Sequence, residues 1–170
     1  MKQEPGTETT PSQWYNSDKY KVSYKRLYKC ASSSIIDLMG KCSQTMEPEY
    51  KKRFTVVRDP LERVKSIYKQ LKSTTKLKER DIKTFSEFLQ YTKDVGLFDK
   101  HQFKQVTIIE NQKMKLFKLE QLHKVCDYIG ANREELKRLN IRKQAIQLTP
   151  QDRQTIKELY QEDIELYNNI

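Results

Sequence analysis

The sequence predicts an α/β fold with a parallel sheet, because short apolar segments alternate with amphipathic ones along most of the chain. The clearest pair begins at residues 53–57, Arg-Phe-Thr-Val-Val, four of which are apolar or β-branched, as expected for a buried strand. A helix follows at once, with Asp59 suited to its N-cap, Pro60 to its first position and Glu62 to a capping box. Its apolar residues recur at helical spacing, at Leu61, Val64, Tyr68 and Leu71.

The N-terminal part of the chain is expected to contain a lead-in and the first strand and helix. Residues 1–18 are polar, with Pro, Gly and Thr, which predicts a flexible lead-in to a single domain at 19–170. Residues 20–30 are rich in Tyr and Val and predict a strand that ends near Lys29 or Cys30. The serines that follow predict a loop and N-cap, and Gly40 a helix stop.

The rest of the chain continues the alternation. Helices are expected to end at Gly96 and at Gly130, the second after an extended start, and Thr149 is expected to cap the final helix. The remaining segments are a loop leading into a strand or extended segment at 101–109, a short helix at 132–140 and an extended basic segment at 141–148.

Composition narrows the function classes. The chain has 170 residues, 33% of them charged, and a formal net charge of +10, which favours an anionic partner. Three cysteines without a C-x-x-C pair indicate neither a disulfide framework nor a zinc site, and two histidines make a histidine-rich metal site unlikely. Reduced thiols, no apolar run of about 20 residues and no signal-peptide core lead us to expect a soluble, cytoplasmic protein.

The loop after the first expected strand has the composition of an anion cradle. Lys29 is followed by the small and hydroxyl residues Ala31 to Ser34, at the start of a helix. Helix N-terminal N–H groups, hydroxyls and a lysine can together hold a phosphate, and small residues let it approach the backbone. The Walker pattern is absent, which disfavours an ordinary kinase or GTPase. The alternative is a serine-rich N-cap without a ligand.

Arg58 and Ser66 make the second candidate site. Arg58 follows the strand at 53–57, and open α/β sheets bind ligands at the carboxyl ends of their strands. Its guanidinium suits bidentate phosphate binding, and the Ser66 hydroxyl could reach the same phosphate if the helix runs beside it. The alternative is an arginine paired with Glu62 and an exposed serine. Two such corners together suggest a ligand with two separated phosphate groups.

These two stretches resemble the carbohydrate sulfotransferases that use 3′-phosphoadenosine 5′-phosphosulfate. KCASSSI looks like that family's 5′-phosphosulfate loop, in a form close to the Pro-Lys-Thr-Ala-Ser-Thr-Ser of uronyl 2-O-sulfotransferases. VVRDPLERVKSIY resembles the 3′-phosphate motif Arg-Asp-Pro-x-x-Arg-x-x-Ser-x-Tyr. The matching residues are Arg58, Asp59, Pro60, Arg63, Ser66 and Tyr68.

Weaker resemblance continues downstream and extends the similarity over about residues 20–170. FDKHQFKQ is similar to a family segment that carries Asp-x-His-x-x-x-Gln, and LFKLEQLHKVCDYIG to one usually written with Phe-Glu-x-Leu. ELYQEDIELY looks like the C-terminal Tyr-x-x-Asp-x-x-x-Tyr/Phe helix. The resemblance implies a nucleotide-kinase-like parallel sheet with helices on both faces, in what looks like a minimal bacterial or viral version acting in the cytoplasm, the host's if viral.

The resemblance also implies roles for the site residues. Arg58 and Ser66 would hold the 3′-phosphate, and Lys29 would stabilise the departing bridging oxygen, so that no metal is needed. Arg142 and Lys143 match a basic loop near the nucleotide. The expected 5′-phosphosulfate contacts are Lys29, Cys30, Ala31, Ser32, Ser33 and Ser34.

The catalytic base is less clearly marked. His101 in FDKHQF is the candidate, because imidazole titrates in the range that the task requires. The sequence departs from the family in having Tyr28 where proline is usual, and in having no histidine between the two phosphate motifs. His123 lies beside an apolar run and is expected to be structural. The rival bases are Glu62, Glu110 and Glu120.

The sequence therefore predicts sulfuryl transfer to a hydroxyl-bearing acceptor, a carbohydrate or small molecule. The Lys-rich residues 68–83 could contact an anionic acceptor, or form only a solvated charged face. The rival function is a basic nucleic-acid-binding module, supported by the charge of +10 and by ten tyrosines that could stack on bases. A third alternative is a fold relative that keeps the cofactor pocket and has lost its base.

Overall fold

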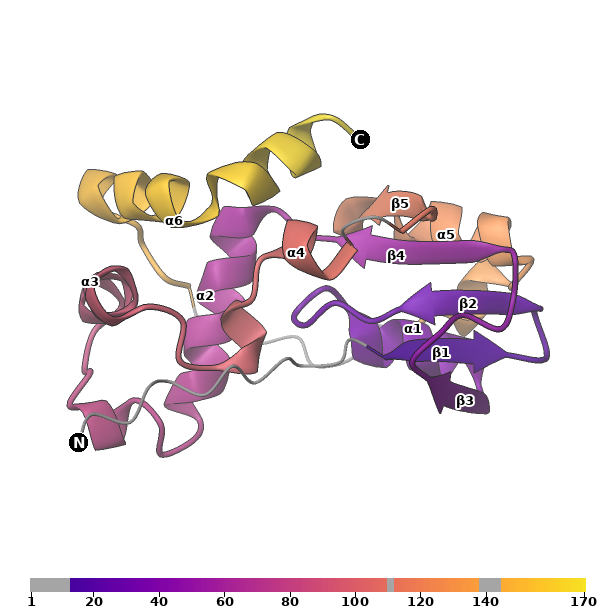
Figure 1. The fold of residues 1–170 in the computed structure, drawn as a ribbon, viewed down its shortest axis with the longest axis horizontal. Coiled ribbons are helices and arrows are strands. Elements are labelled where there is room, and N and C mark those ends of the chain that lie inside the picture. The colour runs from indigo at the N-terminus through magenta and orange to yellow at the C-terminus, as the bar shows by residue number, and fades with distance from the viewer. Residues whose placement is uncertain (1–12, 110–111, 138–144) are drawn as a thin grey trace.

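The computed structural model describes residues 13–109, 112–137 and 145–170. Five strands form one mixed sheet in the order β3-β1-β2-β4-β5 (Figure 1). β2 pairs with β4 and β4 with β5 in parallel, whereas β1 is antiparallel to both β2 and β3. The strands are β1 (Trp14–Ser17), β2 (Val22–Lys25), β3 (Cys42–Thr45), β4 (Arg53–Val57) and β5 (Lys115–Lys118).

An α/β fold is confirmed, but the prediction of an all-parallel sheet is wrong for β1 and β3. Trp14–Ser17, assigned from sequence to the lead-in, is a buried strand between two neighbours. Only four residues separate β1 from β2, and so short a connection permits antiparallel pairing alone. The strand expected at 20–30 ends at Lys25, and the residues after it form a loop.

Most of the expected helices are present. Gly40, Gly96 and Gly130 end α1, α3 and α5, and Thr149 caps α6 by accepting the N–H of Asp152. The α-helices are α1 (Ser32–Met39), α2 (Pro60–Lys72), α3 (Phe85–Val95), α4 (Gln105–Ile109), α5 (Leu122–Ile129) and α6 (Pro150–Asn168). Single 3₁₀ turns lie at Lys78–Arg80, Lys100–Gln102, Leu119–Gln121 and Arg133–Glu135.

Two sequence predictions about local structure are wrong. Residues 101–109 contain no strand: a 3₁₀ turn leads into α4, because the Asp163 carboxylate accepts the N–H groups of Gln105 and Val106 and caps that helix. The helix expected at 132–140 is, in its described part, one 3₁₀ turn at Arg133–Glu135. Of the extended segment expected at 141–148, residues 141–144 lie outside the described residues.

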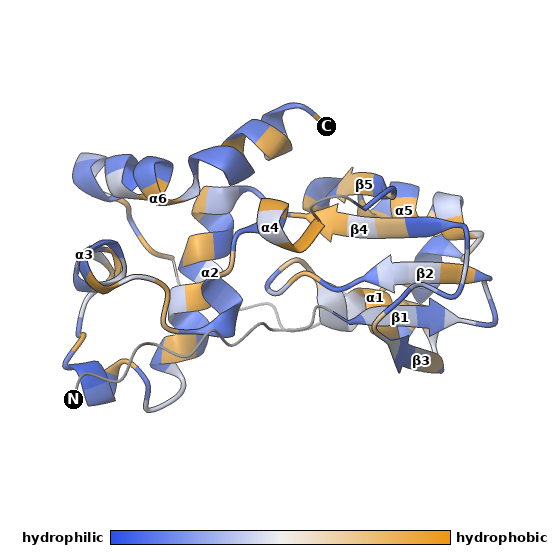
Figure 2. Ribbon diagram, in the orientation of Figure 1, coloured by the Kyte–Doolittle hydropathy of each residue, from blue (hydrophilic) through white to orange (hydrophobic). Residues whose placement is uncertain are grey.

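The apolar side chains form two main cores. One lies between the sheet and helices α1 and α5, and includes Tyr24 and Phe54. The other joins α2, α3 and α6 around Phe88 and Ile156. In Figure 1, α2 and α3 lie beyond the carboxyl ends of β2 and β4. In Figure 2 most residues of α6 are hydrophilic, whereas β4 is hydrophobic at its carboxyl end. The carboxyl ends of the parallel strands thus face a second, helical layer.

Candidate anion-binding site

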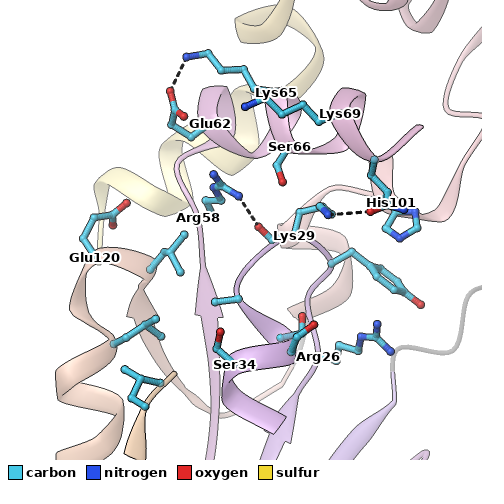
Figure 3. A pocket seen from close by; sticks show the side chains of 18 of the residues that line it. Arg26, Lys29, Ser34, Arg58, Glu62, Lys65, Ser66, Lys69, His101 and Glu120 are labelled. Atoms are coloured by element: carbon cyan, nitrogen blue, oxygen red, sulfur yellow. Dashed lines mark hydrogen bonds and ion pairs between the residues drawn. The ribbon is translucent and has the colours of Figure 1, made fainter. Parts of the chain in front are cut away.

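A pocket of about 870 Å³ opens where β2, β4 and β5 end, between the sheet and α2 (Figure 3). Its size falls in the range of small-molecule sites. The pocket is lined from the segments after all three parallel strands, which is where open α/β sheets bind ligands. Its lining residues are Arg26, Tyr28, Lys29, Ala31, Ser32, Ser33, Ser34, Arg58, Glu62, Lys65, Ser66, Lys69, Gln70, His101, Leu119, Glu120, Leu122, His123 and Leu136.

The loop between β2 and α1 forms one wall of this pocket. Lys29 and Ala31 have φ values of 66° and 59°, in the left-handed region that non-glycine residues adopt at a cost of about 1–2 kcal/mol each. The prediction of a serine N-cap is wrong, since Ala31 is the N-cap of α1 and has no side-chain cap. Ser32 instead closes the loop by donating its hydroxyl to the Leu27 carbonyl at 2.6 Å. The loop therefore turns its backbone, Lys29 and the start of α1 toward the pocket.

Cys30 is the exception among the predicted loop contacts. It is completely buried and does not line the pocket. Its thiol donates to the side-chain oxygen of Gln105 at 3.2 Å, and burial raises its pKa to about 11. The thiol is therefore protonated at neutral pH and serves the packing beneath the loop.

Arg58 enters the same pocket from the carboxyl end of β4. One guanidinium nitrogen donates to the Lys29 carbonyl at 3.1 Å, which links the two loops. Its Nε is buried and has no hydrogen-bond partner among the described residues. The alternative pairing with Glu62 is not observed there, because Glu62 instead pairs with Lys65 at 2.6 Å. A buried guanidinium N–H without a partner is costly. Arg58 also lines the pocket, where a guanidinium suits the binding of an anion.

α2 supplies the opposite wall with one polar face. Asp59 caps the helix by accepting the N–H of Glu62 at 3.0 Å, and Pro60 occupies the first position, as predicted. This start directs Ser66 and Lys69 to the pocket, and Figure 3 shows Ser66, Arg58 and Lys29 around one space. Lys29 extends across the pocket and donates to Gln70 at 3.4 Å. The structure thus brings the two predicted phosphate corners into one pocket.

His101 lies at the end of the pocket beside Tyr28. Their rings meet edge to face with centroids 4.8 Å apart, and His101 Nδ1 lies 2.5 Å from a carboxylate oxygen of Asp99. Burial acts to raise the pKa of Asp99, but hydrogen bonds from His101 and Lys76 outweigh it, so the pKa lies below its usual value. Asp99 is therefore an ionised acceptor at neutral pH.

The pKa of Asp99 leads to a prediction about acid stability. The pKa of Asp99 is lower in the folded chain than in the unfolded chain. The ionised Asp99 carboxylate therefore stabilises the fold above about pH 4, the pKa of an unfolded aspartate, and this stabilisation is lost as the pH falls below that value. Urea unfolding should therefore show a steeper acid loss of stability in the wild type than in Asp99→Asn. Asp94→Asn, at an exposed helix position, should retain the wild-type slope. If the unfolding free energy fell equally with pH in the wild type and in Asp99→Asn, the lowered pKa of Asp99 would be contradicted.

The other candidate bases are placed differently. Glu62 and Glu120 line the pocket, but each already has a partner: Lys65 for Glu62 and the Tyr167 hydroxyl for Glu120, at 2.8 Å. Glu110 lies outside the described residues, as do the predicted cofactor contacts Arg142 and Lys143. The expectation that His123 is structural is wrong, because His123 is exposed and lines the pocket.

A buried network behind the pocket was not assigned a role from sequence. Arg63, only 1% exposed, donates to the carbonyls of Tyr28, His101 and Phe103 at 3.1, 3.1 and 2.7 Å. Its guanidinium also lies 3.7 Å from the buried Asp163 carboxylate. Arg63 therefore fixes the loop that bears Lys29 and the turn that bears His101 relative to each other.

Gln105 completes this network beneath Arg58. Its side chain accepts the N–H of Arg58 and donates to the Arg58 carbonyl, both at 2.9 Å. Its backbone N–H donates to Asp163, whose pKa is raised by burial despite this bond and the nearby Arg63. Arg63, Gln105 and Asp163 fall in the three stretches that were singled out from the sequence for resembling the Arg-Asp-Pro, Asp-x-His and Tyr-x-x-Asp motifs. That resemblance was the only signal in the sequence for this network.

No protein-family model, curated protein sequence or solved structure matches this chain. None of the described helices has the length and hydrophobicity needed to cross a membrane. Within the described ranges, no three His, Cys, Asp or Glu side chains gather in a way that could hold a metal ion.

Proposed function

We propose that this protein is a sulfotransferase that moves a sulfuryl group from 3′-phosphoadenosine 5′-phosphosulfate to an acceptor hydroxyl, on a carbohydrate or small molecule. One observation carries the proposal: Lys29, the start of α1, Arg58 and Ser66 line a single pocket at the ends of the parallel strands. A bisphosphorylated nucleotide has two anionic groups, and the pocket receives one cation from each of two strand-to-helix corners, Lys29 and Arg58.

The distribution of charged and apolar residues in the pocket indicates how the cofactor is oriented in it. The 5′-phosphosulfate lies against the loop from Lys29 to Ser34 and the N-terminus of α1, where the helix dipole favours anions. The 3′-phosphate lies between Arg58 and Ser66, which line the pocket from the end of β4 and from α2. The adenine faces an apolar wall that the sequence did not mark. This wall consists of Leu119, Leu122 and Leu136.

The chemistry then needs one cation and one base from this chain. The acceptor oxygen forms a bond to sulfur as the bond from sulfur to the bridging phosphate oxygen breaks, and negative charge grows on the departing oxygen. Lys29 and the loop N–H groups stabilise that charge. His101 Nε2 accepts the proton of the acceptor hydroxyl. Since His101 and Lys29 line the same pocket, both can act on one acceptor and cofactor.

Calorimetric titration with adenosine 3′,5′-bisphosphate tests this function. The wild type should bind at micromolar affinity or better, and ATP should bind more weakly because it lacks the 3′-phosphate. Arg58→Ala should lose about 10- to 100-fold in affinity, the usual value of a hydrogen-bonded charge. Arg133→Ala removes an arginine that is 60% exposed and does not line the pocket, and should bind like the wild type. A folded wild type that binds no bisphosphate would overturn the proposal.

The nucleic-acid-binding alternative is less well supported by the side chains. Tyr15, Tyr24, Tyr68 and Tyr160 are buried and cannot stack on bases. Titration with a polynucleotide at two salt concentrations tests this alternative, because phosphate-backbone binding weakens steeply with salt.

A further inference from the structure

We propose that Asp99 is a positioning residue that keeps the proton of His101 on Nδ1, so that Nε2 presents its lone pair to the pocket. This inference rests on the proposed function for its chemical meaning, but the tautomer can be measured on the protein alone. A base with its proton on the pocket-facing nitrogen could not accept another from the acceptor hydroxyl. The tautomer therefore decides whether His101 can act.

The exposure of the two side chains separates their roles. The side chain of His101 is 21% exposed and lines the pocket, whereas that of Asp99 is 1% exposed and does not. Asp99 thus cannot touch a ligand in the pocket and acts only through His101. An ionised carboxylate has no proton to donate, so the nitrogen 2.5 Å from its oxygen must carry one.

Both oxygens of the Asp99 carboxylate are held in place. Oδ1 accepts the backbone N–H of His101 at 2.9 Å in addition to the ring contact. Oδ2 forms an ion pair with the ammonium group of Lys76, in the connection that follows α2. A carboxylate with partners on both oxygens cannot rotate away from the imidazole without losing one of them. The contact is therefore a fixed feature of the turn.

The backbone of the same turn is fixed independently. Gln102 is completely buried, and its side-chain oxygen accepts the N–H groups of Phe98 and Asp99 at 2.9 and 3.0 Å. Its amide nitrogen donates to Thr92 at 3.0 Å, which ties the turn to α3. Arg63 binds the His101 carbonyl from the other side. The imidazole is thus held at its backbone and at one ring nitrogen, which leaves the other nitrogen for chemistry.

The tautomer can be read from the ¹⁵N chemical shifts of the imidazole. The chain has only two histidines, so a His123→Gln background leaves one ring to observe. In spectra recorded in alkaline buffer, His101 should carry its proton on Nδ1. Asp99→Asn should shift the population to the Nε2–H form, because an amide can donate to Nδ1. Lys76→Ala and Asp94→Asn keep the Asp99 carboxylate and should retain the Nδ1–H form.

The outcomes separate this inference from the proposed function. An Nε2–H form in the wild type, or the same tautomer population in wild type and Asp99→Asn, would overturn the positioning role whether or not the bisphosphate binds. The wild-type spectrum decides even if Asp99→Asn does not fold. In titrations with adenosine 3′,5′-bisphosphate, Asp99→Asn should stay within about threefold of the wild-type affinity, because Asp99 does not line the pocket. A loss like that of Arg58→Ala would make Asp99 a general scaffold residue instead.

Discussion

Replacement of Lys29 by Ala should lower kcat for sulfuryl transfer by roughly 100- to 1000-fold, the usual effect of removing one preorganised donor from a developing oxyanion. Lys29 is placed for this role because it extends across the pocket from the loop that precedes α1. Its charge meets negative charge that grows only as the bridging oxygen departs, so the loss should fall mainly on kcat and less on cofactor affinity.

The measurement is the rate of adenosine 3′,5′-bisphosphate release from the sulfate donor in single turnovers, with an acceptor found by screening. Ala is a suitable replacement because it leaves a non-glycine residue at the left-handed φ of 66°, so the backbone strain of the loop is unchanged. Lys157→Ala, at an exposed position of α6, is the matched loss of one positive charge and should keep the wild-type rate. An unchanged kcat in Lys29→Ala would remove Lys29 from the chemical step.

The parts of the fold that were predicted correctly have strong local signals. β4 and the start of α2 follow from an apolar run, a capping aspartate and a proline, all within a few neighbouring residues. α4 was missed because its Val-Thr-Ile-Ile sequence favours a strand, and its cap comes from Asp163, far along the chain. β1 was missed because Asn16 and Ser17 are polar, and they become buried only through hydrogen bonds to other segments.

The residues of the site also fall into those with a local sequence signal and those without one. Lys29, the serines and Arg58 were identifiable because a charged or hydroxyl residue at a strand-to-helix corner is itself the signal. The role of Arg63 was not identifiable, because three of its partners are backbone carbonyls, and any residue type provides a carbonyl. The role of Asp99 was likewise not identifiable from sequence, because it depends on the contact of its carboxylate with the ring of His101. Contacts of this kind require the folded chain.

Replacement of Arg63 by Met should have the largest effect on stability, about 3–5 kcal/mol of the unfolding free energy, as expected when one partner of a buried ion pair is removed. The change leaves the Asp163 carboxylate buried without its cation, and leaves three carbonyls without their donor. Urea unfolding followed by circular dichroism gives this free energy directly. A loss below about 1 kcal/mol would mean that the network contributes little.

The surface ion pair of Lys93 and Glu158 provides the control. Its two charges lie closer together than those of the buried pair, yet we expect its loss to change the unfolding free energy much less. Lys93 and Glu158 lie 2.7 Å apart, closer than the 3.7 Å between Arg63 and Asp163, but both side chains are more than 40% exposed. Water and salt already solvate such charges, so Lys93→Met should leave the unfolding free energy almost unchanged. If distance alone decided the effect, Lys93→Met would be the more damaging change. If burial decides, Arg63→Met unfolds the chain first, and it does so by releasing the Lys29 loop and the His101 turn together.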